Sequence, residues 1–460
     1  MKVALVHHHL RPGGVTRVLA NQAAALRDRA QVVILSGEEP DRPPPAPWVL
    51  VPALAYAQDL RERTPPEEVA RQLRQAAHAD LYHFHNPTLG KNPDLPAIID
   101  HLRSAGEHVL LQVHDFAEDG RPGLYPGAGY PADCHYAVIN RRDRGLLQQA
   151  GLLPAGVHHL PNPVQPLAAG PGARHERQLI LYPVRAIRRK NLGEALLLTL
   201  FFPDGCSLGI TRDPTDPLDL LPFRAWRDIA AAKRLPVRFG LGEGRNLEQL
   251  FAETRAVLTT SVQESFGMTF LEPWTAGIEV QGRLLPETCA DFTAEGVRLD
   301  HLYTGLRVPV ALLDADAFRS RWLACYRRRL ACYGLEPDVG EGEAFLDDLL
   351  APGSLDFRLL GEDLQSRVLL EAVAGRRARR RLLELNPFLD TLFRVPLPEQ
   401  TTQSNREAVE SGYSLQRAGA RLWDAYQSVL DTPVRHAIDP RVLARAFNSP
   451  EKILLLQCPS

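Results

Sequence analysis

The chain has 460 residues, of which 45% are hydrophobic and 23% are charged, and its formal net charge at pH 7 is −2. This composition argues against disordered and fibrous proteins, and the balance of 53 basic against 55 acidic residues argues against a surface that coats nucleic acid or an anionic membrane. Only five of the basic residues are lysines against 48 arginines, so a lysine within a motif stands out.

The six cysteines are widely scattered and include no C-x-x-C pair, so their spacing indicates neither a zinc site nor a disulfide framework. We expect reduced packing thiols in a cytoplasmic protein. The longest apolar stretch, residues 195–202, is much shorter than the roughly 20 residues of a membrane span. We therefore expect no transmembrane segment and no nucleic-acid partner, and a peripheral contact with the inner face of the membrane stays open. The cysteines are Cys134, Cys206, Cys289, Cys325, Cys332 and Cys458.

The first 165 residues alternate between short apolar runs and helical periodicity. Residues 3–7 predict a strand, Gly13-Gly14 a turn, and residues 16–27 a helix, followed by a second strand at 32–35. Strands that alternate with helices favour a parallel sheet covered on both faces. Further strands are predicted at residues 81–85, 109–113 and 136–139.

A proline- and glycine-rich run at residues 161–178 has the composition of a domain boundary. A second alternating series follows it, and two doubly wound lobes joined by a linker normally place their ligand in the cleft between them. The predicted strands cover residues 179–183, 207–211, 237–241 and 257–261, and the helices start at Asn191, cover 224–234, and follow Phe266.

Beyond residue 300 the pattern becomes helical, with helices predicted at residues 315–333 and 365–384. Residues 396–405 have the composition of a linker, and residues 406–430 predict a terminal helix. The predicted organisation is an N-terminal lobe at 1–165, a second lobe at 175–300, a helical extension at 301–395, and C-terminal helices at 396–460 that return toward the first lobe.

The sharpest motif is TTSVQESFGMTFLEPWTAG, residues 259–277. A strand ends at Ser261, Glu264 lies in the following loop, and a helix is predicted to begin near Gly267, where backbone N–H groups can bind anions and hydroxyls. Glu272 lies about two helical turns after Glu264, and paired carboxylates suit vicinal hydroxyls. A solvated loop glutamate plus a helix-surface glutamate is the alternative, which spacing alone favours. The N–H groups belong to Phe266, Gly267 and Met268.

This segment resembles the E-x7-E signature of retaining GT-B glycosyltransferases, in particular the large family 4 that includes sucrose-phosphate synthases and bacterial mannosyltransferases. Four further motifs agree in order over residues 1–295. They are Gly13-Gly14 with Arg17, His114-Asp115, Asn162 in LPNPV, and Arg185 with Lys190 in YPVRAIRRKNL.

The resemblance implies an α/β fold of two Rossmann-like doubly wound lobes facing a central cleft, with an added helical C-terminal region. It implies transfer of a sugar from a nucleotide-diphosphate sugar to an acceptor hydroxyl. The implied catalytic residues are His114, Arg185, Lys190 and Glu264. The implied donor-binding residues are Gly13, Gly14, Arg185, Lys190, Gly240, Glu264, Ser265, Phe266, Gly267, Met268 and Glu272, and the acceptor residues are His85 and Asp115.

In detail, the resemblance places Arg185 and Lys190 at the diphosphate, Glu272 at the donor ribose and Glu264 at the transferred sugar. It implies front-face attack with retention, no protein nucleophile, no divalent metal and no cofactor beyond the nucleotide sugar as co-substrate. The acceptor is a small molecule, a glycan or a lipid-linked molecule on the N-terminal lobe, near His85, His114 and residues 120–129. The loop at Gly240 and Leu241 is expected to select the base.

Several of these residues have a simpler interpretation. His114 can be a packed histidine at a strand end, and basic residues before a helix are usually solvated. His7, His8 and His9 resemble a metal cluster, but adjacent residues of a strand point to opposite faces and cannot all reach one ion. His83 and His85 share one strand face, where they border the acceptor or pack in the core.

The chain departs from the family after Glu272. Pro273 follows it directly, and a proline inside a helix costs about 3 kcal/mol unless the first turn starts late. After Gly277, EVQGRLLPETCADF replaces the family's apolar strand and diglycine, and the polar Glu279 and Gln281 make a substitute strand there less certain. Leu285-Pro286-Glu287 still resembles the closing residues of that loop.

Two other functions stay open. A dinucleotide-dependent oxidoreductase would use Glu38 and Glu39 to hold a ribose, although GGVTR lacks the third glycine of that motif. A non-catalytic nucleotide-sugar binding protein would explain the altered loop and the unmatched helices. The sequence does not predict the donor base, the sugar, the acceptor or the oligomeric state.

Overall fold

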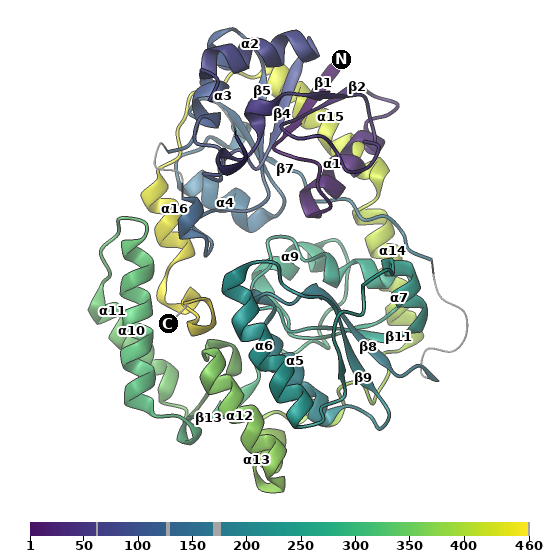
Figure 1. Ribbon diagram of the computed structural model, residues 1–460, viewed down its shortest axis with the longest axis vertical. Coiled ribbons are helices and arrows are strands. Elements are labelled where there is room, and N and C mark those ends of the chain that lie inside the picture. The colour runs from purple at the N-terminus through teal and green to yellow at the C-terminus, as the bar shows by residue number, and fades with distance from the viewer. Residues whose placement is uncertain (61–62, 126–128, 169–175, 459–460) are drawn as a thin grey trace. The chain divides into compact units, whose positions relative to one another are not determined.

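The computed structural model describes residues 1–60, 63–125, 129–168 and 176–458 (Figure 1). The chain divides into two units, each with its own parallel sheet. The predicted boundary between residues 165 and 175 falls mostly on residues 169–175, which lie outside the described residues. Unit 1 comprises Met1–Pro163, Cys332–Leu335 and Tyr413–Asn448, and unit 2 comprises Val164–Ala331, Glu336–Gly412 and Ser449–Ser460.

Unit 1 contains a seven-stranded sheet in the order β3-β2-β1-β4-β5-β6-β7, with every neighbouring pair parallel. The predicted β-α-β unit at the N-terminus is confirmed, because Val3 pairs with Val32 in parallel register. The strands are β1 Lys2–His7, β2 Gln31–Ser36, β3 Trp48–Leu50, β4 Leu81–His85, β5 Val109–Val113, β6 His135–Val138 and β7 Val157–His159. The helices are α1 Gly14–Ala25, α2 Pro66–Ala77, α3 Leu95–Ser104, α4 Arg141–Gln149, α15 Leu415–Asp431 and α16 Pro440–Phe447.

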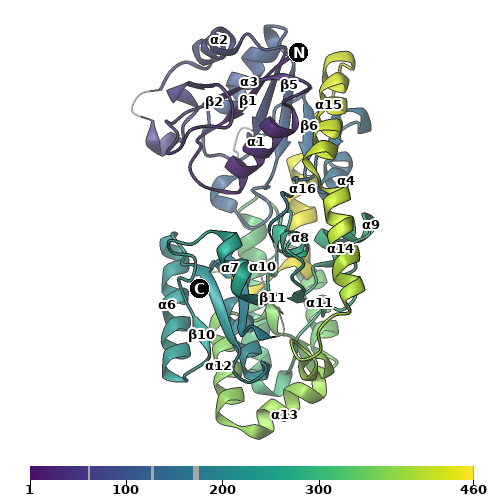
Figure 2. The ribbon, with the colours of Figure 1, turned by 90° about the vertical axis from the view of Figure 1, so that its right-hand side faces the viewer.

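Both faces of this sheet are apolar because helices cover each of them. Ala4 and Val6 belong to the core shared with α2 and α3, whereas Val3 and Leu5 belong to the core shared with α1 and α15. Figure 2 shows α15 alongside α1, on that second face. Because side chains alternate along a strand, His7 at the end of β1 lies on the α15 face. The C-terminal part of the chain therefore completes the core of unit 1.

Unit 2 contains a five-stranded parallel sheet in the order β10-β9-β8-β11-β12. Leu181 and Val257 of its central strands pack with Phe251 of α7 and Ile278 in one buried cluster. The strands are β8 Leu179–Arg185, β9 Ser207–Arg212, β10 Val237–Arg238, β11 Thr254–Thr259 and β12 Val280–Gly282. The helices are α5 Leu192–Leu198, α6 Pro217–Ala232, α7 Leu247–Glu253, α8 Glu272–Thr275 and α9 Pro286–Ala294.

A mainly helical region follows α9 in unit 2. Its one small sheet pairs β13 with β14 in antiparallel register, and α10 and α11 lie side by side (Figure 1). The elements are β13 Arg307–Pro309, α10 Ala315–Ala331, α11 Val339–Leu350, β14 Ser354–Asp356, α12 Glu362–Ala374, α13 Arg376–Leu385 and α14 Glu399–Gly412. The predicted α/β class with two Rossmann-like lobes and a helical C-terminal region is confirmed.

Four details of the structure differ from what the sequence indicated. The expected linker at 396–405 is largely helical, because α14 begins at Glu399. The expected helices at 365–384 and 406–430 are each two helices, separated near Gly375 and at Tyr413. A strand does follow Gly277, because β12 pairs in parallel with β11. The helix expected to begin near Gly267 is only a 3-10 turn, Met268–Phe270, before the four-residue α8.

The expectation that all six cysteines are reduced is also wrong. Cys325 on α10 and Cys458 near the C-terminus form a disulfide, and their Cα atoms are 5.9 Å apart, within the usual range. The two cysteines are 133 residues apart in sequence, so spacing offers no signal for the pair. The other four cysteines are free thiols.

Within the described part of the chain, no helix combines the length and apolar character that crossing a membrane requires.

Candidate functional site

Lys190 and Glu264 meet at the carboxyl ends of two neighbouring strands of unit 2. Lys190 ends a 3-10 turn after β8, and Glu264 lies in the loop after β11, the strand that pairs with β8. The Lys190 ammonium forms an ion pair with Oε1 of Glu264, and the Ser261 hydroxyl donates to the same oxygen at 2.7 Å. The structure therefore brings together two of the predicted catalytic residues and adds Ser261 to them.

Buried hydroxyl groups form hydrogen bonds with the backbone around this pair. The Tyr182 hydroxyl donates to the carbonyl oxygen of Lys190 at 2.6 Å, and the Thr260 hydroxyl donates to the same oxygen at 2.9 Å. The Val262 amide donates to the carbonyl of Arg189 at 2.9 Å. Because these bonds join the loop after β8 to the loop after β11, the two loops are held as one platform.

The charge of Glu264 is set by its neighbours rather than by its burial. Burial raises the pKa of the Glu264 carboxyl. The nearby charges of Lys190 and Arg189 and the hydrogen bonds from Lys190 and Ser261 lower the pKa by more than burial raises it. The net effect places the pKa below its ordinary value. Glu264 is therefore ionised at neutral pH, and the exposed fractions of the Lys190 and Glu264 side chains are only 12% and 9%.

Arg185, the other predicted cation of this motif, lies elsewhere. It ends β8, and its Nη1 donates to the Thr215 hydroxyl at 2.6 Å, in the segment between β9 and α6. Arg185 is therefore held toward that segment and does not join the Lys190 and Glu264 pair.

The segment around Gly267 differs from the prediction for a local reason. Gly267 has φ +91°, and a Cβ there would lie 2.9 Å from the Phe270 ring, so the position requires glycine. The turn delays the helix until Glu272, which puts Pro273 in the first turn of α8, where proline removes no hydrogen bond. Glu272 is buried, and its carbonyl accepts from the Thr275 hydroxyl at 2.7 Å.

The remaining predicted donor residues of unit 2 lie in different surroundings. Phe266 is buried against Phe292, at a ring-centroid distance of 5.5 Å. Ser265 and Met268 are partly exposed. Gly240 has φ +68° and lies in the turn after β10. The amide of the next residue, Leu241, donates to the carbonyl of Ile210 at 3.0 Å.

A buried charge network that the sequence analysis missed supports the Lys190 loop. Arg283 follows β12 and is fully buried between Glu194 of α5 and Asp356 of β14. Asn191, next to Lys190, donates to Oε2 of Glu194 at 2.7 Å. The only signal in the sequence was an arginine in a segment whose neighbours looked too polar for a strand.

The C-terminal residues also reach this site. Gln457 donates to Oε1 of Gln263 at 2.5 Å, directly beside Glu264 in sequence, and Nη1 of Arg329 donates to Gln457 at 2.9 Å. The disulfide between Cys325 and Cys458 anchors the same segment to α10. The sequence carries no signal for these contacts, because the C-terminal segment matches no motif.

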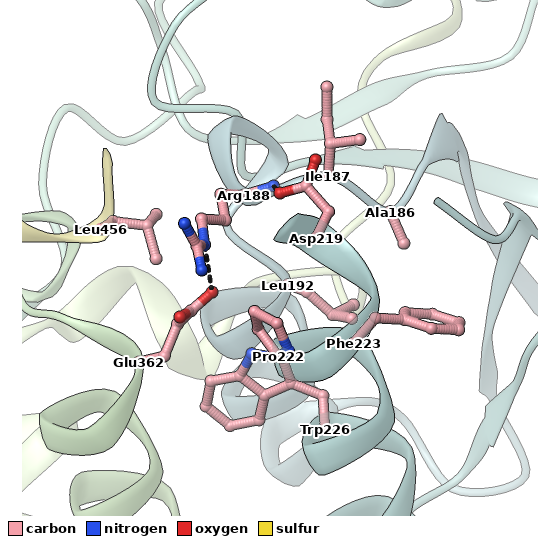
Figure 3. A pocket seen from close by; sticks show the side chains of 10 residues that line it. All are labelled: Ala186, Ile187, Arg188, Leu192, Asp219, Pro222, Phe223, Trp226, Glu362 and Leu456. Atoms are coloured by element: carbon pink, nitrogen blue, oxygen red, sulfur yellow. Dashed lines mark hydrogen bonds and ion pairs between the residues drawn. The ribbon is translucent and has the colours of Figure 1, made fainter. Parts of the chain in front are cut away.

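A small pocket lies beside the Lys190 loop (Figure 3). The Arg188 guanidinium pairs with Glu362 at 3.3 Å, and the Arg188 amide donates to Asp219 at 3.2 Å. The rest of the lining is largely apolar and includes Trp226 and Leu456. Because its one guanidinium is already paired with Glu362 and Asp219 adds a second carboxylate, this pocket does not suit a phosphate.

In unit 1 the structure brings together the predicted His114 and His85. Nε2 of His114 lies 3.0 Å from Nδ1 of His85, and the rings are stacked with centroids 5.3 Å apart. The prediction that His83 and His85 share a strand face is confirmed, because their rings stack at 4.4 Å. Burial lowers the pKa of His114 to about 4, although Asp115 acts in the opposite direction. His114 is therefore neutral at physiological pH.

Asp115 is a partly exposed neighbour of this stack. Its carboxylate forms an ion pair with Arg121 at 3.0 Å. Asn86, which has a left-handed φ of 52°, accepts hydrogen bonds from the amides of both His114 and Asp115 through its side-chain oxygen. The loop after β4 therefore fixes the start of the loop after β5.

The glycine turn of unit 1 begins α1. Gly13 is the N-terminal cap in an extended conformation, and a Cβ at Gly14 would meet no atom within 4 Å. The contacts within the chain therefore do not explain the glycine at 14.

Residues 120–129 were predicted to lie near the acceptor. Of these, residues 126–128 lie outside the described residues. Among the residues that the structure does describe, no group of three or more His, Cys, Asp or Glu side chains is arranged to hold a metal ion.

No protein-family model matches the chain. One curated relative, the mannosylglucosyl-3-phosphoglycerate synthase of Petrotoga mobilis, is 25% identical over 326 residues, which cover 58% of this chain and 62% of the relative. The chain thus matches less than two thirds of the length of that relative.

Solved structures with similar folds are glycosyltransferases. Anabaena HepE in complex with UDP-glucose has a TM-score of 0.55 at 12% identity and covers 93% of this chain and all of its own. A Rickettsia africae glycosyltransferase has a TM-score of 0.52 at 10% identity, covering 94% of this chain and 99% of its own. The catalytic domain of starch synthase IV from Arabidopsis thaliana, bound to ADP and acarbose, has a TM-score of 0.51 at 12% identity, with coverages of 93% and 99%. These similarities show the GT-B fold.

Proposed function

We propose that the protein is a glycosyltransferase that moves a sugar from a nucleotide-diphosphate sugar to an acceptor hydroxyl. The observation that carries the proposal is the cluster of Lys190 with the buried Glu264 and Ser261. It lies at the carboxyl ends of β8 and β11, the place where open α/β sheets bind their ligands. The GT-B fold and the UDP-glucose bound by HepE support a nucleotide sugar as that ligand.

The cluster suits a reaction in which negative charge grows on a departing diphosphate. The Lys190 ammonium is held in place by Glu264 before any ligand arrives, so it can stabilise that charge without reorganisation. The ionised Glu264 can in addition accept hydrogen bonds from sugar hydroxyls, and such charge-assisted bonds are the strong ones.

In this proposal the transfer retains the anomeric configuration. The bond from the anomeric carbon to the diphosphate breaks while the acceptor oxygen bonds to the same face, and the departing phosphate takes the acceptor's proton. Glu264 then serves as a hydrogen-bond partner and not as a nucleophile, which suits a carboxylate already engaged by Lys190 and Ser261. The proposed reaction uses no metal ion and no cofactor besides the co-substrate.

The relative from Petrotoga mobilis guides the choice of substrates, because its name describes the synthesis of a sugar-linked 3-phosphoglycerate. We therefore propose UDP-, GDP- and ADP-sugars as donors to compare, and sugar-linked phosphoglycerates among the acceptors.

Donor binding is tested by thermal shift with UDP-glucose, GDP-mannose and ADP-glucose. One of them should raise the melting temperature with the logarithm of its concentration, and Lys190→Gln should weaken that response. Lys233→Gln is the matched control, because Lys233 is exposed at the end of α6. If no nucleotide sugar binds or is hydrolysed, the proposal fails.

Transfer is tested separately from binding. The protein is incubated with the nucleotide sugar that it binds and with mixtures of acceptors. Proton NMR of the product should then show the same anomeric configuration as in the donor. Donor binding without transfer to any acceptor would instead favour a binding protein. Tight NAD binding without nucleotide-sugar binding would favour an oxidoreductase.

A further inference from the structure

Lys91 lies in a cluster of aromatic and imidazole rings in unit 1. Its ammonium donates to the Tyr56 hydroxyl at 2.8 Å and lies 4.5 Å from the centre of the Tyr56 ring. The rings of His8 and His9 each lie 5.1 Å from the Tyr56 ring. We call Tyr56, Lys91, His8 and His9 the Lys91 cluster.

The ammonium of Lys91 differs from the other cations near it. Arg11 pairs with Glu38 at 2.7 Å, and Arg121 pairs with Asp115 at 3.0 Å. Lys91, by contrast, is half-buried, and within the described residues its side chain has only the neutral Tyr56 as a partner. Burial lowers the pKa of Lys91, and the positive charge of Arg121 lowers it as well, whereas the carboxylate of Asp115 raises it. A partly desolvated cation without a carboxylate is a position that an anion would stabilise.

The histidines beside Lys91 carry unused ring nitrogens. Nδ1 of His8 lies 2.8 Å from the carbonyl of Leu54, which can only accept, so Nδ1 carries the proton. Nε2 of His8 and Nδ1 of His9 are buried without a hydrogen-bond partner in the described part of the chain, and His8 is only 3% exposed. Buried polar atoms of this kind call for a missing partner such as a ligand or an ion.

The cluster lies where a substrate is expected on this sheet. His8 and His9 directly follow β1, and Lys91 belongs to the loop after β4, the neighbour of β1. Both segments therefore leave the sheet at its carboxyl edge, the ligand-binding edge of parallel sheets. Asn92 holds the segment before Tyr56 in place by donating to the carbonyls of Ala53 and Ala55, each at 2.9 Å.

We propose that Lys91, with His8 and His9, binds an anionic group of the acceptor, a phosphate or a carboxylate. Lys91 supplies the charge, and Tyr56 orients the ammonium. The Tyr56 hydroxyl accepts from Lys91 and donates to Nε2 of His9 at 2.8 Å, so Nδ1 of His9 carries the proton and can donate to the anion. Nε2 of His8 can only accept, and it suits a hydroxyl of the same ligand. The role of the anion as part of an acceptor rests on the proposed function, but the binding of the anion itself does not. It can be measured with no nucleotide sugar present.

The test is an NMR titration of the full chain labelled with ¹⁵N at the histidine rings. The probes are glycerol 3-phosphate, glycerate and glycerol, which offer a phosphate, a carboxylate and neither. We expect the His8 and His9 resonances to shift with an anionic probe and not with glycerol. His135 and His158 provide the internal control, because His135 is the first residue of β6 and so lies at the amino end of the parallel strands, away from their carboxyl ends.

Lys91→Gln should raise the dissociation constant for the anionic probe about tenfold or more, as expected for the loss of a charge-assisted hydrogen bond. Lys91→Arg keeps the charge and should retain most of the binding, which separates lost charge from lost folding. Lys233→Gln removes a charge from unit 2 and should leave the dissociation constant unchanged.

The outcomes distinguish the possibilities. A response to glycerol 3-phosphate alone identifies a phosphate site, and a response to glycerate alone identifies a carboxylate site. Shifts confined to His135 and His158, no response to either anion at millimolar concentration, or equal binding by wild type and Lys91→Gln would overturn the proposal. Anion binding by a protein that binds no nucleotide sugar would overturn the proposed function and leave the anion site standing.

Discussion

Nη2 of Arg283 lies 2.6 Å from Oε2 of Glu194, and neither side chain is exposed to solvent. On its other side Arg283 contacts both oxygens of Asp356 at 2.7 Å, and Asp356 is also paired with Arg358 at 3.2 Å. Two arginines, the fully buried Arg283 and the partly exposed Arg358, therefore balance two carboxylates of unit 2. Since Glu194 is in the first turn of α5 and Asp356 ends β14, this network joins the helical region to the helix that follows Lys190.

Replacement of Arg283 should destabilise the protein strongly. Arg283→Met leaves Glu194 and Asp356 buried without their shared cation, which typically costs about 3–5 kcal/mol. Urea unfolding of unit 2, followed by tryptophan fluorescence, measures the loss. The control is Arg227→Met, whose partner Asp213 is 3.4 Å away in a half-exposed pair worth about 0–1 kcal/mol. Equal unfolding midpoints for the two variants would contradict a structural role for the network.

Loss of the Lys190 charge should slow sugar transfer without unfolding the chain. A charge-assisted hydrogen bond contributes about 1.5–3 kcal/mol, so Lys190→Gln should lower kcat about tenfold or more. Glu264→Gln should lower it as well, and the double variant should lose less than the product of the single losses, because the two side chains act as a pair. Steady-state kinetics with whichever nucleotide sugar the thermal-shift comparison selects measures all three. Independent effects of the two substitutions would show that the ion pair has no catalytic importance.

The elements predicted correctly are those whose signal is local. The apolar runs at residues 3–7, 81–85 and 109–113 became β1, β4 and β5, because strands covered on both faces must be apolar throughout. A strand at β12 was less certain from the sequence because Gln281 and the following Arg283 are polar, yet both side chains are buried. Arg283 is compatible with burial because Glu194 lies 89 residues earlier in the chain and Asp356 lies 73 residues further along it.

The candidate site shows the same division. The sequence placed Lys190 and Glu264 in two motifs that each follow a strand, but it did not predict their ion pair. The parallel pairing of β8 with β11 brings the two strand ends together. The contact between Gln457 and Gln263 joins residues 194 positions apart and belongs to no motif. The wrong helix at Gly267 has a local cause, because φ +91° at this glycine replaces the expected helix start with a single turn.

The disulfide should be detectable and should stabilise unit 2. Peptide mapping without reductant is expected to yield one linked pair containing Cys325 and Cys458, with Cys332 alkylated in the same sample. Cross-links that close long loops typically contribute about 2–4 kcal/mol, so Cys458→Ser should lower the free energy of unfolding by that order. Treatment with dithiothreitol should lower the melting temperature of wild type but not of Cys458→Ser. Equal responses would show that the pair is not oxidised in solution.

The buried histidines of unit 1 should make the fold sensitive to mild acid. Burial lowers the pKa of His83 to about 3 and that of His114 to about 4, with neighbouring groups making smaller contributions. In the unfolded chain both titrate near 6.5, so between about pH 6.5 and 4 the unfolded state binds more protons. Stability is therefore fully present above about pH 6.5 and falls as the pH decreases, by about 1.4 kcal/mol per pH unit for each histidine.

The contribution of His83 can be isolated by substitution. His83→Gln keeps a polar group near the Tyr426 hydroxyl, 2.9 Å from Nδ1 in the wild type, but does not titrate. Urea unfolding at several pH values between 6.5 and 4.5 measures how the free energy of unfolding depends on pH. The dependence should be shallower for the variant, by about the contribution of one titrating histidine. Carboxylates titrate equally in both proteins, so their effect cancels in the comparison. Parallel slopes would mean that His83 takes up its proton in the folded state as readily as in the unfolded chain.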